Sequence, residues 1–248
     1  MTLFRNFLYI LCYLSFVQLS FGPVTINGIP AVAVKKNIVV AFDLHGVLFN
    51  VSTKGVMKTL WNTPKKLSLI KLMLTPSFRK QYKATKKLAL STEQRMKLLM
   101  PTFPELQKYK KYFIELCNQQ DINQDVLAFI RKLKSQGYHL VIASNIGEET
   151  YQELVAKYPI LKELFEYAFT SGKISGYAKK SSPLYFDRLK ALVKEKYMSE
   201  NIIFIDDHAA AVASACAKNI NGIVFVDAAQ VSKDFDTAIA LINENAKK

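Results

Sequence analysis

Apolar residues follow two alternating patterns along the chain after residue 36. Short runs of β-branched or aromatic residues, such as IVVAF and NIIFI, end at polar loops, and between these runs apolar residues recur at intervals of three or four. The short runs are typical of strands buried on both faces, and the spaced residues are typical of amphipathic helices. Their alternation predicts an α/β fold in which helices cover both faces of a parallel sheet.

Strands and helices are expected to alternate regularly after Asn123, and one further strand precedes this region. One helix is expected between Asn123, a suitable N-cap, and Gly137, a suitable stop. Strands are expected over residues 37–42, 138–143, 166–170, 201–205 and 222–226, and further helices over 148–158, 182–197 and 209–218.

The segment between the first strand and Asn123 has a different composition. From Lys54 to Glu115 it contains fifteen Lys or Arg residues and three Glu, in sequence that mostly favours helices. This segment accounts for most of the net charge of +14. We therefore expect a core over residues 37–50 and 121–248, interrupted by a helical, lysine-rich insertion over residues 51–120.

The first residues have the layout of a signal peptide. No acidic residue precedes Asp43, and Arg5 is followed by an apolar run over residues 7–21. The run is short for a membrane span, which needs about 20 residues. We expect residues 1–22 to direct export, to the periplasm or outside the cell, and to be removed. An uncleaved amino-terminal membrane anchor is the alternative, because Pro23 would directly follow the cleavage site.

Polar side chains stand where three of the expected strands end. Asp43 follows the first strand, Ser144 the second, and Asp206 with Asp207 the strand over residues 201–205. In open parallel sheets, ligands bind at the carboxyl ends of strands, near the point where strand order reverses. Clustered carboxylates repel each other unless a cation holds them, and oxygen ligands favour Mg²⁺. The sequence therefore predicts a site for one Mg²⁺ ion at this edge.

Four short motifs occur in order at these strand ends. The first strand runs into DLHGVL, residues 43–48, and the second ends in Ala143-Ser144-Asn145. A lysine then precedes an expected helix; Lys180 aligns best and Lys179 is the alternative. The last motif is the acidic pair at residues 206 and 207. Together they resemble the motifs of the haloacid dehalogenase-like (HAD) superfamily, whose hydrolases use an aspartate nucleophile.

The resemblance extends from residue 37 to about residue 226 and implies both a fold and an activity. The implied fold is a Rossmann-like three-layer core with a parallel sheet, in which residues 51–120 form an all-helical cap. The implied activity is that of a phosphoric monoester hydrolase, a Mg²⁺-dependent phosphatase that acts on a small phosphorylated substrate through an aspartyl-phosphate intermediate.

The resemblance also implies a role for each matching residue. Asp43 would be the nucleophile, and Ser144 and Lys180 would offset the charge of the transferring phosphoryl group. Asn145 would join these two in binding the substrate. The Mg²⁺ ligands would be Asp43, the main-chain carbonyl of His45, Asp206 and Asp207. The cap, with its lysines, would close over the site and select the leaving group.

His45 departs from the family pattern, because phosphatases of this family carry a second aspartate there as general acid and base. An imidazole can transfer protons, since its unperturbed pKa is about 6.5, but beside Mg²⁺ and a lysine it would tend to be neutral. Two alternatives follow. The protein could be a degenerate member that binds a phospho-ligand, an anionic lipid or nucleic acid without turnover, or a metal-independent haloacid dehalogenase.

The lysine-rich segment suggests an anionic partner. A solvated basic face that steers the phosphorylated substrate is the main expectation, and peripheral association with a membrane is the second. No nucleic-acid partner is expected, because aromatic residues at helical spacing favour core packing over base stacking; these are Trp61, Phe78, Tyr82, Tyr109 and Tyr112. Cys117 and Cys216 could pair in an oxidising compartment, but two small buried hydrophobic residues are the expected reading.

Overall fold

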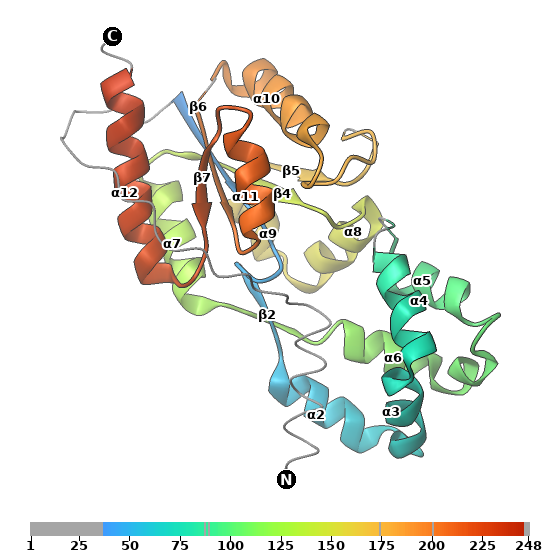
Figure 1. Ribbon diagram of the computed structural model, residues 1–248. Helices are drawn as coiled ribbons and strands as arrows, with labels where there is room; N and C mark the ends of the chain where they lie inside the picture. Colours follow the sequence, from blue (N-terminus) through green and yellow to red (C-terminus); the bar gives the residue numbers. More distant parts are fainter. Residues whose placement is uncertain (1–36, 87, 89, 174, 200, 246–248) are drawn as a thin grey trace. The chain divides into compact units, whose positions relative to one another are not determined.

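The computed structural model describes residues 37–86, 88, 90–173, 175–199 and 201–245 (Figure 1). These form two compact units. Asn50–Asp121 make up the insert unit, and the described residues before and after it make up the core unit. Among the described residues, no helix combines the length and apolar character that a membrane span needs. The expected signal peptide, residues 1–22, lies outside them.

A five-stranded parallel sheet of order β5-β4-β1-β6-β7 forms the centre of the core unit. The chain passes from β1 outwards through β4 to β5, and then continues on the other side of β1 with β6 and β7. Strand order therefore reverses between β1 and β6, where such sheets bind ligands. The strands are β1 (Ile38–Phe42), β4 (His139–Ser144), β5 (Tyr167–Thr170), β6 (Asn201–Asp206) and β7 (Asn221–Val224), which confirms the five expected strands to within two residues.

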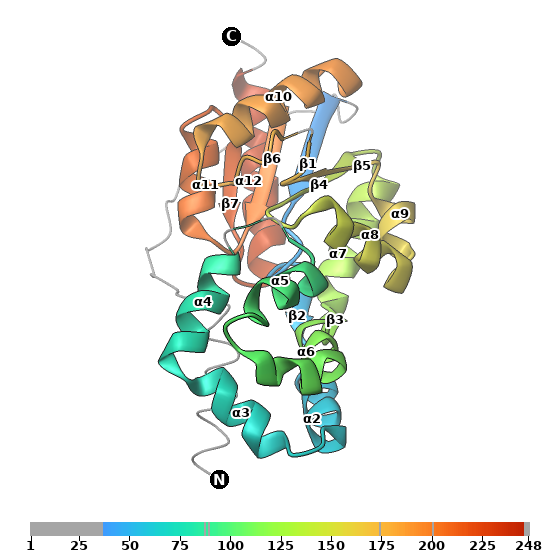
Figure 2. The ribbon, with the colours of Figure 1, turned by 90° about the vertical axis from the view of Figure 1, so that its right-hand side faces the viewer.

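Helices cover both faces of this sheet, which confirms the three-layer fold (Figures 1 and 2). In β1, Val40 and Phe42 pack into one hydrophobic cluster and Val39 and Ala41 into the other, because successive side chains point to opposite faces. The first cluster includes residues of α7 (Gln124–Ser135), α8 (Glu148–Lys157), α9 (Ile160–Leu164) and α12 (Ala228–Asn245), and the second includes residues of α10 (Pro183–Tyr197) and α11 (Ala209–Cys216).

The ends of α7 follow from two residues of the sequence. The side-chain oxygen of Asn123 accepts a hydrogen bond from the N–H of Val126 at 3.3 Å and so caps the first turn. Gly137 follows the last turn with a φ of +84°, a conformation that glycine adopts without steric cost. The helix expected between these two residues is confirmed.

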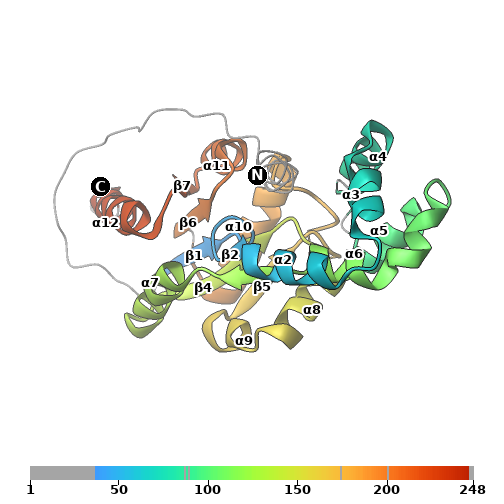
Figure 3. The same ribbon diagram turned by 90° about the horizontal axis from the view of Figure 1, so that it is seen from below.

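The insert unit is helical and has a core of its own. Buried residues of its helices form a separate hydrophobic cluster, in which the ring of Phe78 packs edge-on against Phe103 and Phe113. Helix α2 packs against α6, and α3, α4 and α5 follow one another in space as in sequence (Figure 3). The helices are α2 (Thr53–Asn62), α3 (Lys66–Leu74), α4 (Pro76–Lys86), α5 (Thr92–Leu99) and α6 (Lys110–Cys117), with a 3₁₀ helix over Pro104–Tyr109.

The aromatic residues of the insert unit divide into two groups. Phe78 and Tyr109 are buried, as expected from their helical spacing, and Tyr82 is half-buried. The expectation is wrong for Trp61, which is 78% exposed. Trp61 lies on the face of α2 opposite Val56 and Leu60, the residues that this helix buries. Its position in the helical repeat therefore turns it to solvent.

The chain enters and leaves the insert unit through a pair of short strands, β2 (Phe49–Val51) and β3 (Gln120–Ile122). Directly inside this pair, the N–H of Ser52 donates to the carbonyl oxygen of Gln119 at 3.0 Å. Ser52 and Gln119, which lie close to the two ends of the inserted segment, are therefore neighbours, although 67 positions separate them in the sequence.

The two described cysteines are not joined in a disulfide. The Cys117 thiol is half-buried in the insert unit, 3.6 Å from the hydroxyl of Tyr82. Cys216 is exposed at the end of α11, so the expectation of a buried small residue is wrong there. In the last turn of this helix the side chain of Ala215 is buried, whereas that of Cys216 points to solvent.

Candidate active site

Asp43 stands one residue beyond β1, at the point where strand order reverses. Every residue of β1 is buried, and the N–H of Asp43 continues the ladder by donating to the carbonyl oxygen of Ile205 at 2.9 Å. The side chain is 8% exposed, and Oδ1 of its carboxylate accepts a hydrogen bond from the N–H of Leu44 at 2.8 Å. The strand thus delivers a nearly buried carboxylate whose orientation is fixed by the backbone.

Lys180 joins this carboxylate to a second one. Its Nζ lies 2.7 Å from Oδ2 of Asp43 and also bonds Oδ2 of Asp206, the last residue of β6. Phe42 is in register with Ile205, so Asp43 and Asp206 stand at the same level on adjacent strands. All three side chains are nearly inaccessible, with exposures of 8%, 4% and 0% for Asp43, Lys180 and Asp206. One cation thus bridges two buried carboxylates.

The ionisable side chains of this group shift each other's pKa values. Burial lowers the pKa of the Lys180 ammonium, but the charges of Asp43 and Asp206 outweigh it, so the pKa stands above its usual value and the lysine remains charged. Burial, reinforced by the charge of Asp43, raises the pKa of Asp206 to about 6, even though Lys180 acts in the opposite direction. The site thus holds more negative charge than its lysine neutralises.

Residues at the end of β4 hold Lys180 in place. The side-chain oxygen of Asn145 accepts the backbone N–H of Lys180 at 2.8 Å. Ser144, the last residue of β4, is buried one position beyond the level of Asp43. Of the two candidate lysines, Lys180 is the one whose ammonium reaches Asp43; Lys179 is half-buried beside it.

Asp207 and Gly46 meet directly. The φ of Gly46 is +86°, and a Cβ at this position would lie 2.3 Å from Oδ2 of Asp207. His45 directly precedes Gly46 and is half-buried in the same turn. Its backbone pairs with that of Phe49 in an isolated β-bridge. The turn after Asp43 therefore brings the backbone against the acidic pair in a way that only glycine permits.

Asp207 has the features of a cation ligand. Its Oδ1 lies 2.8 Å from Nδ1 of His208, whereas its Oδ2 is buried and has no hydrogen-bond partner in the described structure. Such an orphaned acceptor is costly unless something else satisfies it. Asp206, Asp207 and His208 offer ligand atoms that all lie within 4.8 Å of one another. The hydrogen bond to Asp207 raises the pKa of His208, despite its partial burial.

Replacing Gly46 with alanine should destabilise the protein and disturb the acidic pair. The added Cβ would overlap the Asp207 carboxylate. In addition, the alanine would have to adopt the left-handed φ of Gly46, and such strained backbone costs on the order of 1–3 kcal/mol. Gly137→Ala is a matched control, because its φ is +84° and nothing lies within 4 Å of its added Cβ. Calorimetry should show a larger loss of stability for Gly46→Ala; equal losses would mean that backbone strain alone is at work.

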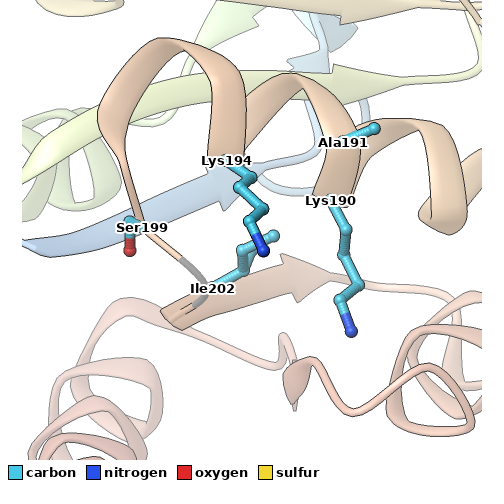
Figure 4. Close-up of a pocket in the computed structure, with 5 residues that line it drawn as sticks. All are labelled: Lys190, Ala191, Lys194, Ser199 and Ile202. Carbon is cyan, nitrogen blue, oxygen red and sulfur yellow. The ribbon is translucent and has the colours of Figure 1, made fainter.

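A separate hollow of about 210 Å³ lies at the other end of the sheet (Figure 4). It is lined by Lys190, Ala191 and Lys194 of α10, by Ser199 and by Ile202, the second residue of β6. Asp206 ends the same strand four residues later, roughly 13 Å away at about 3.3 Å per residue. This hollow is therefore distinct from the carboxylate cluster.

The chain also matches a known family. The model of the haloacid dehalogenase-like hydrolase family matches residues 39–218, which include β1 except its first residue, the insert unit, β4 and β6. The chain belongs to this family. Every strand end that carries a residue of the cluster falls within the match. No protein of the curated set matches this HAD-like hydrolase.

Several solved structures share the fold of this chain. A hydrolase from Streptococcus pneumoniae TIGR4 is 19% identical, with a TM-score of 0.52 over 81% of this chain and 99% of the other. A HAD family enzyme from Bacteroides thetaiotaomicron, in complex with magnesium and inorganic phosphate, is 19% identical, with a TM-score of 0.51 over 75% and 92%. L-2-haloacid dehalogenase from Xanthobacter autotrophicus, with chloropropionic acid covalently bound, is 16% identical, with a TM-score of 0.51 over 74% and 75%.

Three residues of the site escaped sequence reasoning. Gly46 carries a signal, since a glycine in the turn after Asp43 indicates a close approach of the backbone. For His208 the sequence gives a single indication, its position directly after the acidic pair Asp206-Asp207. Tyr185 gives no signal at all, yet its buried hydroxyl donates to the carbonyl oxygen of Phe169 at 2.7 Å. Burial and the charges of Asp43 and Asp206 raise the pKa of this hydroxyl, which therefore keeps its proton.

Proposed function

We propose that this HAD-like hydrolase is a Mg²⁺-dependent phosphatase of small phosphorylated substrates, in which Asp43 is the nucleophile. The observation that carries the proposal is the cluster of three carboxylates, Asp43, Asp206 and Asp207, with a single buried lysine among them. A carboxylate can attack an anionic phosphoryl group only where positive charge offsets the repulsion. One lysine leaves a surplus of negative charge that a divalent cation would balance.

The residues present fit a magnesium ion. Mg²⁺ takes oxygen ligands and usually binds through one or two carboxylates together with substrate phosphate. Asp43 and Asp207 would supply the carboxylates, with Asp206 and the carbonyl of His45 as further candidate ligands; the orphaned Oδ2 of Asp207 supports this assignment. When bound, the ion would reduce the repulsion between Asp43 and the substrate. The complex of the Bacteroides enzyme with magnesium and phosphate supports the proposal by analogy.

The chain's own side chains divide the reaction into two displacements. In the first, a carboxylate oxygen of Asp43 forms a bond to phosphorus while the bond from phosphorus to the leaving oxygen breaks, and His45 gives that oxygen a proton. Lys180 offsets the charge on the phosphoryl oxygens, and the Ser144 hydroxyl donates to one of them. In the second, water gives a proton to His45 and attacks phosphorus, which releases phosphate and restores the Asp43 carboxylate.

A metal-independent haloacid dehalogenase is the second candidate. The same attack by Asp43 on a carbon atom would expel a halide, and the dehalogenase neighbour with covalently bound chloropropionic acid belongs to the same fold. The direct contact of Lys180 with Asp43 is compatible with either reaction. The orphaned oxygen of Asp207 favours the phosphatase, because a metal-free reaction gives it no partner.

Hydrolysis of p-nitrophenyl phosphate and of 2-chloropropionate, each with Mg²⁺ or with EDTA, tests the two proposals together. We expect turnover of the phosphate ester that needs Mg²⁺ and no release of chloride. Chloride release that persists in EDTA would establish the dehalogenase instead. If neither compound nor a panel of phosphorylated metabolites turns over, the protein is a degenerate member that binds its ligand without chemistry.

Magnesium should also raise the melting temperature of the protein. A ligand at about 100 times its Kd stabilises the folded state by roughly 2.7 kcal/mol, and for a chain of this size about 1 kcal/mol corresponds to 2–4 °C. We therefore expect a rise of about 5–10 °C, measured by calorimetry without substrate. Asp207→Asn should remove most of this rise, whereas Asp236→Asn, at an exposed position on α12, should leave it intact. An unchanged rise in Asp207→Asn would exclude this carboxylate as a ligand.

A further inference from the structure

One exposed surface of the insert unit combines lysines with large apolar side chains. Helix α2 buries Val56 and Leu60 and turns its opposite face to solvent. That face carries Lys54, Met57, Lys58 and Trp61, which are spaced three and four residues apart and therefore form one stripe along the helix. Two cations thus flank a methionine and a tryptophan that have no place in the core.

The stripe continues where α3 begins. The ammonium of Lys66 lies 4.4 Å from the centroid of the Trp61 ring, so the end of α2 and the start of α3 meet at this indole. The next residue, Leu67, is 70% exposed, and Lys71 is exposed one turn further along the same helix. We call these seven residues the basic-apolar patch: Lys54, Met57, Lys58, Trp61, Lys66, Leu67 and Lys71.

The charges in the part of the sequence that forms the patch are all positive. Residues 44–92 contain ten Lys or Arg and no Asp or Glu. Arg79, Lys80 and Lys83 of α4, the helix that follows α3, are exposed as well. Lys65 and Lys66 even stand at the amino terminus of α3, where the helix dipole disfavours a cation, and no acidic residue occupies the first turn of α2, α3 or α4. An external anion would relieve this accumulated charge.

We propose that the basic-apolar patch binds the surface of a membrane that contains anionic lipids. Amphipathic helices that lie in the lipid interface combine lysines with Trp, Leu or similar apolar residues, and an indole is well suited to the headgroup level, where one edge is wet and the other apolar. Here the apolar side chains would enter the headgroup region while the surrounding lysines contact lipid phosphates. This inference does not depend on the reaction that the core unit catalyses.

Lipid fits the patch better than a nucleic acid does. Proteins that bind single strands stack successive bases on several aromatic side chains, whereas the patch has a single exposed aromatic ring, Trp61, and its other apolar members are aliphatic. Met57 and Leu67 have no ring on which a base could stack, but both can enter the acyl boundary of a bilayer. Phosphate attraction alone is common to both partners, so the aliphatic residues decide between them.

Trp61 reports directly on this binding, because it is the single tryptophan of the chain. In the full chain, its emission should shift to shorter wavelength on titration with vesicles of phosphatidylcholine and phosphatidylglycerol, and not with phosphatidylcholine alone. Raising the salt from about 0.1 M to 1 M shortens the screening length from roughly 10 Å to 3 Å and should reverse the shift. No shift with the anionic vesicles would overturn the proposal, as would a shift seen only with a single-stranded oligonucleotide.

A matched pair of triple variants tests the location of the surface. Lys54→Gln, Lys58→Gln and Lys71→Gln together should weaken vesicle binding on the order of 100-fold, at about fivefold for each charge near the membrane. The control replaces Lys132, Lys162 and Lys233, which are exposed on the core unit, and so removes the same net charge. It should weaken binding far less. Any binding by the apolar segment over residues 7–21 is common to both variants and cancels in the comparison. Equal losses of vesicle affinity in the two variants would show that the basic-apolar patch is not the binding surface.

Discussion

Asp43→Asn should abolish turnover while leaving the protein folded. The amide has almost the shape of the carboxylate but lacks its nucleophilic oxygen, and loss of a nucleophile commonly costs on the order of 10⁴-fold or more in kcat. Lys180 retains Asp206 as its partner, so no buried charge is left without compensation. The measurement is the kcat for p-nitrophenyl phosphate at saturating Mg²⁺.

His45→Ala provides the comparison for this result. If His45 transfers the protons, its loss should reduce kcat by roughly 10²–10⁴-fold. Hydrolysis of the aspartyl phosphate should slow for every substrate, whereas its formation should slow chiefly for substrates with poor leaving groups, since p-nitrophenolate leaves without a proton. The dependence on the leaving group thus separates proton transfer from nucleophilic attack. Appreciable turnover by Asp43→Asn would show that another group attacks phosphorus, and the proposed mechanism would be wrong.

Lys180→Met should cause the largest loss of stability of any single substitution at the site. It leaves Asp43 and Asp206 buried without a cation, and removing one partner from a buried ion pair typically costs about 3–5 kcal/mol. The free energy of unfolding should be measured without Mg²⁺, by calorimetry or by circular dichroism in urea. Trp61 fluorescence is unsuitable here because that residue lies in the insert unit.

The loss of stability caused by Lys180→Met should grow as pH rises. Already in the wild type, the pKa of Asp206 is raised to about 6, so the folded protein holds this proton more tightly than the unfolded chain does. Stability therefore falls as pH rises from about 4 to about 6. Without the Lys180 charge the pKa of Asp206 rises further, which extends the fall to higher pH.

Two further variants separate the charge effect from a packing effect. Lys179→Met, at the neighbouring half-buried position, should cost little. Adding Asp206→Asn to Lys180→Met should recover part of the stability, because one of the two stranded carboxylates is then gone. A loss that is independent of pH and is not recovered by the second substitution would show that Lys180 acts through its packing alone.

The sequence was sufficient for the fold of the core unit and for the strand ends that carry the site. Each strand is a short apolar run with a polar stop, and the parallel arrangement follows from the helices between them, so Asp43, Ser144 and Asp206 could be placed at one edge before any coordinates were known. The insertion could be predicted only as helical, because its lysines support a helix without specifying which face packs inwards.

Details that depend on tertiary contacts lay beyond the sequence. Lys179 and Lys180 have the same chemistry in the same loop, and only the contact of the Lys180 ammonium with the Asp43 carboxylate shows which side chain turns towards the site. The exposure of Trp61 depends on the rotation of α2 against α6, and aromatic residues at helical spacing usually pack inwards. Similarly, the contact of Gly46 with Asp207 joins residues 161 positions apart and leaves no local pattern.

The β2–β3 pair makes the inserted segment a replaceable module. Because Ser52 and Gln119 are already hydrogen-bonded neighbours, the segment between them can lengthen, shorten or be exchanged without moving either end. A tight two-residue turn suffices to join two paired strands, and even a long insertion at such a point adds only about 0.6 kcal/mol of closure entropy for each doubling of its length. The architecture thus allows the inserted segment to change in length and sequence while the residues at the edge of the sheet stay in place.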